Sequence, residues 1–231
     1  MPLALKPPIV CYVTDRSALG SPEPIPALLQ KIQLALEAGV DWLQIREKDL
    51  PARSLLALAR EAIGAAVPLD RSGAGKTLIL INDRLDVALA AGAAGVHLGR
   101  ESVPAAEVVR WCRDGNAPVD FRIGVSCHSL DEAREAENAG ADYVFFGPVY
   151  DTPSKRRYGA AQGIARLAEV CRSVSIPVIA IGGVDSHNAA ECLEAGTAGI
   201  AAIRMFQEAA DAQALREALA HIHRKARFGI S

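Results

Sequence analysis

The sequence predicts an α/β fold, a single-domain (β/α)8 TIM barrel, and three observations carry this prediction. Four segments share one shape, a helix end followed by an apolar strand: 35–47, 88–99, 136–147 and 192–203. Filling the gaps between them gives eight strands, each followed by a helical stretch, in a chain of 231 residues. The strands are continuous apolar runs, as expected when helices cover the outer face and the inner face is packed.

The strands follow from these apolar runs in chain order. In each repeated segment a glycine ends the helix, where a left-handed residue is needed: Gly39, Gly92, Gly140 and Gly196. The strand begins within about two to four residues, a short link that is typical of βαβ units. The eight strands are expected at 9–14, 42–46, 78–82, 95–98, 122–126, 143–146, 177–181 and 199–203.

A helical segment is predicted after each strand, with alanine and leucine as its main residues. These segments include 25–38, 54–65, 130–138, 164–172, 188–194 and 212–224. A polar, glycine-containing loop at 69–76 delays the third strand. A doubly wound open sheet is the alternative, but its usual G-x-G-x-x-G turn is absent after the first strand. We therefore expect one domain over residues 1–231, with its core at about 9–225.

Composition and charge argue against several classes of partner. Half of the residues are hydrophobic, the formal net charge is −2 and the isoelectric point is near 6.2, which gives no electrostatic reason to expect nucleic acid or an anionic membrane. No apolar run approaches the ~20 residues of a membrane span, and the first ten residues are too proline-rich for a signal peptide. The five cysteines lack C-x-x-C spacing. A cytoplasmic protein with reduced core thiols is expected.

The predicted strand ends carry far more polar side chains than packing explains. In a TIM barrel the C-terminal ends of the strands converge on the active site. The residues expected there are Gln44, Arg46, Lys48, Asn82, Asp83, His97, Arg100, Glu101, Ser126, His128, Thr152, Ser154, Lys155, Gly182, Gly183 and Arg204. Cations dominate this rim although the chain as a whole is slightly negative. The contrast predicts a substrate that carries phosphate or diphosphate.

Two segments of this rim strengthen the phosphate hypothesis. IGGV at 181–184 and IAAIRMF at 200–206 end the last two strands, where many barrels bind phosphate through glycine N–H groups and a helix N-terminus. The polar loop TPSKRRYGAAQG, at 152–163, offers hydroxyl and ammonium donors and has the composition of a mobile lid. A solvated basic loop is the alternative interpretation of that loop.

Five motifs in this order resemble one family: LQIREKDL, LILINDRLDVALAAGAAGVHLG, IGVSCHSLDEA, GADYVFFGPVYDTPSK and IPVIAIGGV. They are similar to thiamine phosphate synthase and to its close paralogue, thiazole tautomerase, and the likeness runs over about 10–206. The resemblance implies a barrel enzyme that joins hydroxymethylpyrimidine diphosphate to thiazole phosphate. Thiamine phosphate and diphosphate are the products, and Mg²⁺ is the cofactor.

The resemblance also implies roles for individual residues. The diphosphate would be bound by Arg46, Lys48 and Lys155, because fixed cations stabilise the charge that builds on a leaving group. Neutral hydrogen-bonding groups would hold the aminopyrimidine: Gln44, Asn82 and Ser126. Asp83 would be a Mg²⁺ ligand. The thiazole phosphate would be bound by Thr152, Ser154, Gly182, Gly183, Ile203 and Arg204.

The sequence departs from the synthase pattern after the fourth strand. The family typically has H-x-G-Q-[DE]-D there, and its final Asp is the second Mg²⁺ ligand. This chain has HLGRESV, so Ser102 stands at the ligand position and Arg100 replaces the Gln. Glu101 is an alternative metal ligand, and Arg100 is an alternative phosphate ligand. At the eighth strand, Arg204 stands where the synthase usually has a small serine.

The alternative functions are a thiazole tautomerase and a non-catalytic phosphate-binding barrel. Tautomerisation requires proton transfer and no metal, and the resemblance assigns that transfer to the histidine of S-x-H, here His128. The retained Lys48, Asn82 and Asp83 favour the synthase, because a tautomerase has no diphosphate to hold. Both enzymes would act on small molecules, and a homo-oligomer stays open.

Overall fold

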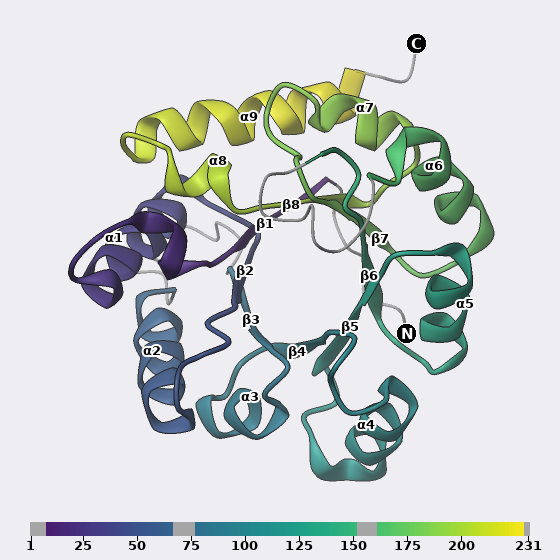
Figure 1. The fold of residues 1–231 in the computed structure, drawn as a ribbon, viewed down its shortest axis with the longest axis horizontal. Helices are drawn as coiled ribbons and strands as arrows, with labels where there is room; N and C mark the ends of the chain where they lie inside the picture. Colours follow the sequence, from purple (N-terminus) through teal and green to yellow (C-terminus); the bar gives the residue numbers. More distant parts are fainter. Residues whose placement is uncertain (1–7, 67–76, 152–160, 229–231) are drawn as a thin grey trace.

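A computed structural model describes residues 8–66, 77–151 and 161–228, and it confirms the TIM barrel. Eight parallel strands pair in sequence order and close into a barrel, with the last strand hydrogen-bonded to the first. The helices form a ring outside the strands (Figure 1). No helix in the described ranges is both long and apolar enough to cross a membrane.

The strands lie where the sequence predicts them, within one residue at most ends. Pairing with neighbouring strands fixes these bounds, so a residue beyond the last pair, such as Thr14 or Ile203, is left out of the strand, whereas Cys127 pairs with Phe146 and is included. The strands are β1 Ile9–Val13, β2 Trp42–Ile45, β3 Leu78–Asn82, β4 Gly95–Leu98, β5 Arg122–Cys127, β6 Tyr143–Phe146, β7 Val178–Ile181 and β8 Gly199–Ala202.

The helices include every segment that the sequence placed explicitly. Left-handed glycines follow the helices at all four predicted positions, with φ between 71° and 99°. The α-helices are α1 Pro24–Ala38, α2 Ala52–Ala65, α3 Leu85–Ala91, α4 Ala105–Trp111, α5 Leu130–Asn138, α6 Gly163–Ser173, α7 Ala189–Glu194, α8 Arg204–Gln207 and α9 Ala212–Phe228. A 3₁₀ helix, η1, covers Arg16–Leu19, and a π-helical turn, η2, covers Cys112–Asn116.

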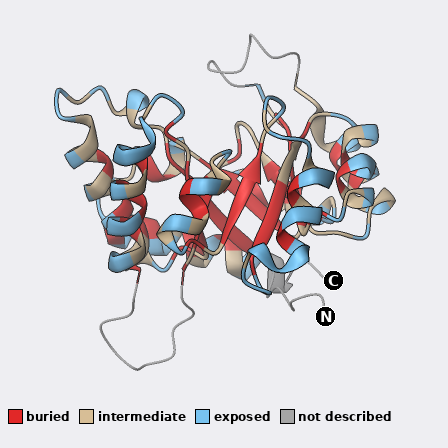
Figure 2. Ribbon diagram, turned by 90° about the horizontal axis from the view of Figure 1, so that it is seen from below, coloured by how far each residue is buried: buried red, intermediate tan, exposed pale blue. Residues whose placement is uncertain are grey.

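The core has two parts, one between barrel and helices and one inside the barrel (Figure 2). Inside, the Tyr143 ring fills the space over Gly124, where an added Cβ would lie 2.1 Å from Tyr143 Cζ. Trp42 and Phe145 pack around the same ring. These aromatic side chains close the barrel interior and form the floor on which the C-terminal rim stands. All five cysteines are free and four are buried, in agreement with core thiols.

Candidate active site

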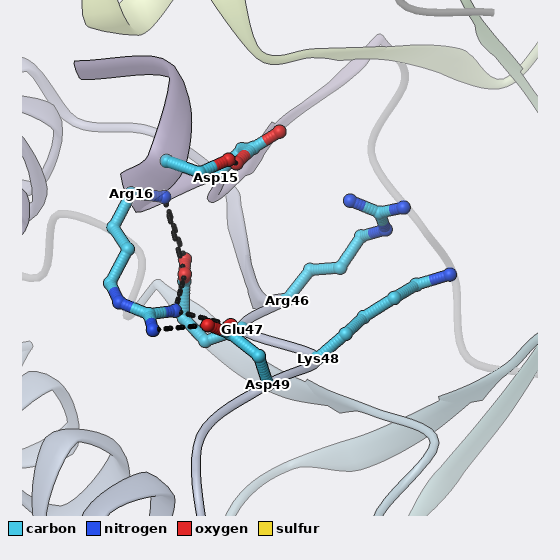
Figure 3. A pocket seen from close by; sticks show the side chains of 7 residues that line it. Asp15, Arg16, Arg46, Glu47, Lys48 and Asp49 are labelled. Atoms are coloured by element: carbon cyan, nitrogen blue, oxygen red, sulfur yellow. Dashed lines mark hydrogen bonds and ion pairs between the residues drawn. The ribbon is translucent and has the colours of Figure 1, made fainter. Parts of the chain in front are cut away.

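Side chains at the charged end of β2 point alternately to the two sides of the strand, which separates the cations from the carboxylates. Gln44 points to the barrel interior, where its Nε2 donates to Asn82 Oδ1 at 3.1 Å, whereas Ile45 packs in the core beneath the helices. The alternation continues past the last strand pair, because Figure 3 shows Arg46 and Lys48 extending together, away from the side chain of Glu47. The cations of this segment therefore face the bowl at the C-terminal ends of the strands.

Arg46 and Lys48 bring two positive charges together at the bowl. Burial and the neighbouring charge of Arg46 lower the pKa of Lys48, while Asp83 opposes that shift. Within the described part of the chain, neither cation forms an ion pair. Two adjacent positive groups without a carboxylate partner provide the charge that a diphosphate requires. Lys155, predicted to act with them, lies outside the described residues, as do Thr152 and Ser154.

A neutral hydrogen-bonding surface lies beside the cations. Asn82 at the end of β3 meets Gln44, and Ser126 on β5 is held by His97 Nε2 at 2.9 Å. His97 Nδ1 lies 3.1 Å from the Tyr143 hydroxyl. Burial, with a smaller effect from the charge of Arg46, lowers the pKa of His97 to about 3, so this ring is neutral. Such a surface suits an uncharged heterocycle better than a phosphate.

Asp83 and Ser102 meet at the ends of β3 and β4. The Ser102 hydroxyl donates to Asp83 Oδ1, and its oxygen accepts from the Gly99 backbone N–H at 2.8 Å. Asp83 has a φ of +65°, a conformation uncommon outside glycine, and its own N–H donates to His97 O at 2.8 Å. The structure thus places Ser102 beside the predicted metal ligand, while Glu101 is exposed on the same turn. Arg100 is also exposed there.

His128 is fixed at the start of α5. Its backbone N–H donates to Glu132 Oε2 at 2.6 Å, and Glu132 N–H donates to the Ser129 hydroxyl at 3.1 Å, which together cap the helix. The His128 ring nitrogen Nδ1 is hydrogen-bonded to the carbonyl oxygen of Gly147. The carbonyl oxygen can only accept a hydrogen bond, so Nδ1 carries the hydrogen, and the lone pair of this tautomer is at Nε2.

The paired glycines after β7 form a turn that admits no side chain. Gly182 and Gly183 have φ values of 94° and 70°, and an added Cβ would lie 2.5 Å from Pro148 Cα or 2.7 Å from Tyr150 Cβ. The Tyr150 N–H donates to Gly182 O at 2.9 Å, which ties this turn to the segment after β6. A backbone held this way lets a phosphate approach its N–H groups closely.

The other predicted phosphate contacts lie at the end of β8. Ile203 directly follows that strand, and the exposed Arg204 begins α8. The cations after β2 and the backbone turns after β7 and β8 therefore lie at the same, C-terminal end of the barrel. Because the strands close into one barrel, these two regions surround the same opening.

The comparison with known families agrees with this geometry. The family described as thiamine monophosphate synthase matches residues 10–206, most of the chain. The chain belongs to this family. Its match spans β1 to α8 and so includes all the strand ends described above.

Relatives of this thiamine monophosphate synthase family member come from several organisms. A Geobacter sulfurreducens protein, assigned provisionally as a thiamine-phosphate synthase, is 48% identical over 191 residues, 83% of either chain. The thiamine-phosphate synthase of Roseiflexus sp. strain RS-1 is 41% identical over 211 residues, 91% of this chain and 83% of the relative. The structure of thiamine phosphate pyrophosphorylase from Pyrococcus furiosus has a TM-score of 0.77 at 31% identity, covering 96% and 97% of the two chains.

Two features of this family member's site were not given a role by sequence reasoning. His97 was expected at the rim, but its contacts with Ser126 and Tyr143 depend on which way the strand faces. Arg16, just after β1, was missed altogether, although it contacts the segment after β2. The alternating charges of IREKD were the available signal, because a strand-like alternation sends Glu47 away from the bowl and requires a cation there.

Proposed function

We propose that this chain is a thiamine phosphate synthase, a transferase that couples hydroxymethylpyrimidine diphosphate with thiazole phosphate. The observation that carries the proposal is the pair Arg46 and Lys48, which face the bowl beside neutral hydrogen-bonding groups. Family membership supports the same reaction. The substrates are small molecules; the expected absence of nucleic-acid and membrane partners, and a homo-oligomer, stay predictions.

The proposed reaction begins with loss of the diphosphate. As the C–O bond breaks, negative charge grows on the leaving oxygens, and Arg46 and Lys48 stabilise that charge most in the transition state. Lys155 is proposed to add a third cation. Gln44 and Asn82 hold the aminopyrimidine by hydrogen bonds, so the departing heterocycle stays oriented for attack by the thiazole nitrogen.

Ser126 and its partner His97 contribute orientation to the same step. The neutral His97 ring is fixed between two hydroxyl groups, which leaves the Ser126 oxygen at a defined position on the pyrimidine side. The thiazole phosphate is proposed to bind at Gly182, Gly183, Ile203 and Arg204, with Thr152 and Ser154. Neither substrate then needs a strong base, because positioning and charge stabilisation supply the catalysis.

Mg²⁺ is proposed as the cofactor, with Asp83 as its protein ligand. Asp83 is close enough to Lys48 to affect the pKa of that amine, so its carboxylate borders the proposed diphosphate site. Mg²⁺ usually takes one or two carboxylates and completes its shell with phosphate oxygens and water, which the single Asp83 permits. Bound there, the ion would neutralise charge on the diphosphate. Ser102 supplies a neutral oxygen where the family pattern has a carboxylate, and Glu101 stays an alternative ligand.

A thiazole tautomerase is the second candidate, and the fixed His128 ring is the observation that favours it. The contact with Gly147 leaves a basic Nε2, which a proton transfer at the thiazole requires. His128→Asn separates the two functions. A tautomerase should lose isomerisation of the thiazole carboxylate phosphate without metal, whereas a synthase should lose little coupling activity. If both activities persist in the variant, His128 is a structural residue.

The decisive experiment is incubation with both thiamine precursors and Mg²⁺, followed by detection of thiamine phosphate and diphosphate. The synthase predicts both products in equal amounts. The matched control omits the thiazole phosphate and should give no thiamine phosphate. If neither product forms although inorganic diphosphate binds, the chain is a non-catalytic phosphate-binding barrel and the proposed function is wrong.

A further inference from the structure

Arg16 forms a charged fork between the first and second strand ends. Its Nη1 donates to Glu47 Oε2 at 2.9 Å and to Asp49 Oδ1 at 2.7 Å, and its Nη2 donates to Asp49 Oδ2 at 2.6 Å (Figure 3). The backbone N–H of Arg16 also reaches Glu47 Oε2 at 3.2 Å. The contact with Arg16 lowers the pKa of Asp49. One guanidinium therefore holds two carboxylates that are close in the sequence to Arg46 and Lys48.

Thr14 connects the same carboxylate to the backbone of Arg46. The buried Thr14 hydroxyl donates to Glu47 Oε1 at 2.6 Å and accepts from the Arg46 backbone N–H at 2.9 Å. Glu47 is 4% exposed, so its charge requires these partners. The start of the anion-binding segment is thus fixed by one hydroxyl group that neither substrate is expected to touch.

The order of charges explains why such an arrangement is needed. Arg46, Glu47, Lys48 and Asp49 alternate in sign along the chain. A carboxylate left without a partner would be attracted to the cations on either side of it and would compete with a bound anion. Arg16 holds both carboxylates on the side of the segment away from the head groups of Arg46 and Lys48 (Figure 3).

We propose that Arg16 and Thr14 are positioning residues for diphosphate binding. They hold Glu47 and Asp49 away from the bowl, so that Arg46 and Lys48 stay free for the leaving group. This inference rests on the proposed function, because it assumes that the anion at these cations is a diphosphate. It adds a role for the segment after β1, which contributes no ligand of its own to the proposed site.

The first test measures binding of inorganic diphosphate by calorimetry, together with kcat and KM. Arg16→Gln is expected to weaken diphosphate binding and lower kcat/KM by about 10- to 100-fold, the range for a displaced supporting contact. The matched control is Arg113→Gln, which breaks the ion pair with Asp142 at the other end of the barrel and should leave both values unchanged. Wild-type affinity in Arg16→Gln overturns the inference. A wild type that binds no diphosphate overturns the proposed diphosphate site as well.

The second test asks whether Arg16 acts by holding the carboxylates away from the cations or only by maintaining the local structure. Arg16→Gln frees the carboxylates of both Glu47 and Asp49, and adding Glu47→Gln with Asp49→Asn neutralises both. The triple variant should therefore recover diphosphate affinity to within a few-fold of wild type. If the triple variant binds as weakly as Arg16→Gln alone, or more weakly, the effect is structural and the inference is wrong.

Thr14 gives an independent measurement if the Arg16 variants do not fold. Thr14→Val keeps the shape of the side chain but removes the hydroxyl that joins Glu47 to the Arg46 backbone, whereas Thr14→Ser keeps the hydroxyl. Diphosphate binding should be weakened in the valine variant and close to wild type in the serine variant, with circular dichroism unchanged in both. Equal affinity in the two variants overturns the role of Thr14.

Discussion

The two ends of the barrel use the same kinds of charged residue for opposite purposes. At the N-terminal end, Asp41 Oδ2 accepts from the Val10 backbone N–H at 2.8 Å, and Asp142 Oδ2 accepts from the Ile123 N–H at 2.7 Å. Each carboxylate satisfies the start of the preceding strand and also meets a cation or a histidine. In the described part of the C-terminal end, Arg46 and Lys48 have no carboxylate partner.

The comparison shows how repeated units acquire different tasks. Asp41 and Asp142 occupy the same place in their repeats, directly before β2 and β6, and the other two repeats have Ala94 and Ala198 there. The N-terminal contacts stabilise the barrel because their hydrogen bonds are complete. The C-terminal cations Arg46 and Lys48 form no ion pair with the described residues, so they stay available to a ligand, as the proposed function requires.

The largest effect is expected at the C-terminal end. Arg46→Ala should lower kcat/KM on the order of 10²-fold or more, because it removes a contact to the charge of the leaving group. Lys155→Ala, in the segment outside the described residues, should give a loss of the same size. Steady-state coupling assays with a thermal unfolding curve check both. Values of kcat/KM near wild type in both variants would contradict the diphosphate assignment.

At the N-terminal end, a substitution is expected to lower stability and to leave activity nearly unchanged. Asp41→Ala should destabilise the fold by about 1 to 2 kcal/mol, because the Val10 N–H loses a charged acceptor. Coupling activity should stay within about two-fold of wild type, since the change is remote from the bowl. Urea unfolding measures the first effect. Asp86→Ala, which breaks an exposed pair with Arg84, is the matched control and should cost less than about 1 kcal/mol. Equal losses in the two variants would contradict the comparison.

A smaller effect is expected at the altered metal site. Ser102→Asp should lower the Mg²⁺ concentration needed for half-maximal coupling several-fold, because it restores an anionic oxygen beside Asp83. Asp83→Asn should raise that concentration. If Glu101 already contacts the ion, Glu101→Gln should raise it and Ser102→Asp should add little. Identical magnesium titrations for all these proteins would contradict a metal-assisted synthase.

The smallest effect concerns pH and the N-terminal end. His223 on α9 lies 3.5 Å from Asp41, and this contact raises the pKa of the histidine above 6.5. The pKa of His223 is higher in the folded state than in the unfolded state. The stabilisation is therefore fully present at pH values below the unfolded-state pKa, and it is lost as pH rises through the folded-state pKa. His223 is 35% exposed, so we expect less than about 1 kcal/mol. Unfolding temperatures of wild type and His223→Gln should differ at pH 5.5 and converge at pH 8.5. A difference that grows with pH would be the wrong sign.

The fold and much of the rim were predictable because their signals are local. Helix ends, glycines and apolar strands recur within about a dozen residues, and barrel geometry places strand ends together. The position of Ser102 was harder to predict, because the turn that begins at Gly99 decides whether Ser102 or Glu101 faces Asp83. The Arg16 fork was not predicted, because it joins residues 31 to 33 positions apart on two different loops.

The alternation beyond β2 restricts how this loop can change in length during evolution. Deleting Arg46, or inserting one residue directly after Ile45, would reverse the direction of the later side chains in this alternating segment. Glu47 and Asp49 would then face the bowl, and their negative charge would repel the diphosphate that is proposed to bind there. Changes of two residues would keep the signs in place. Variants whose loop length differs by one residue should therefore lose diphosphate binding, whereas variants whose loop length differs by two residues should retain it.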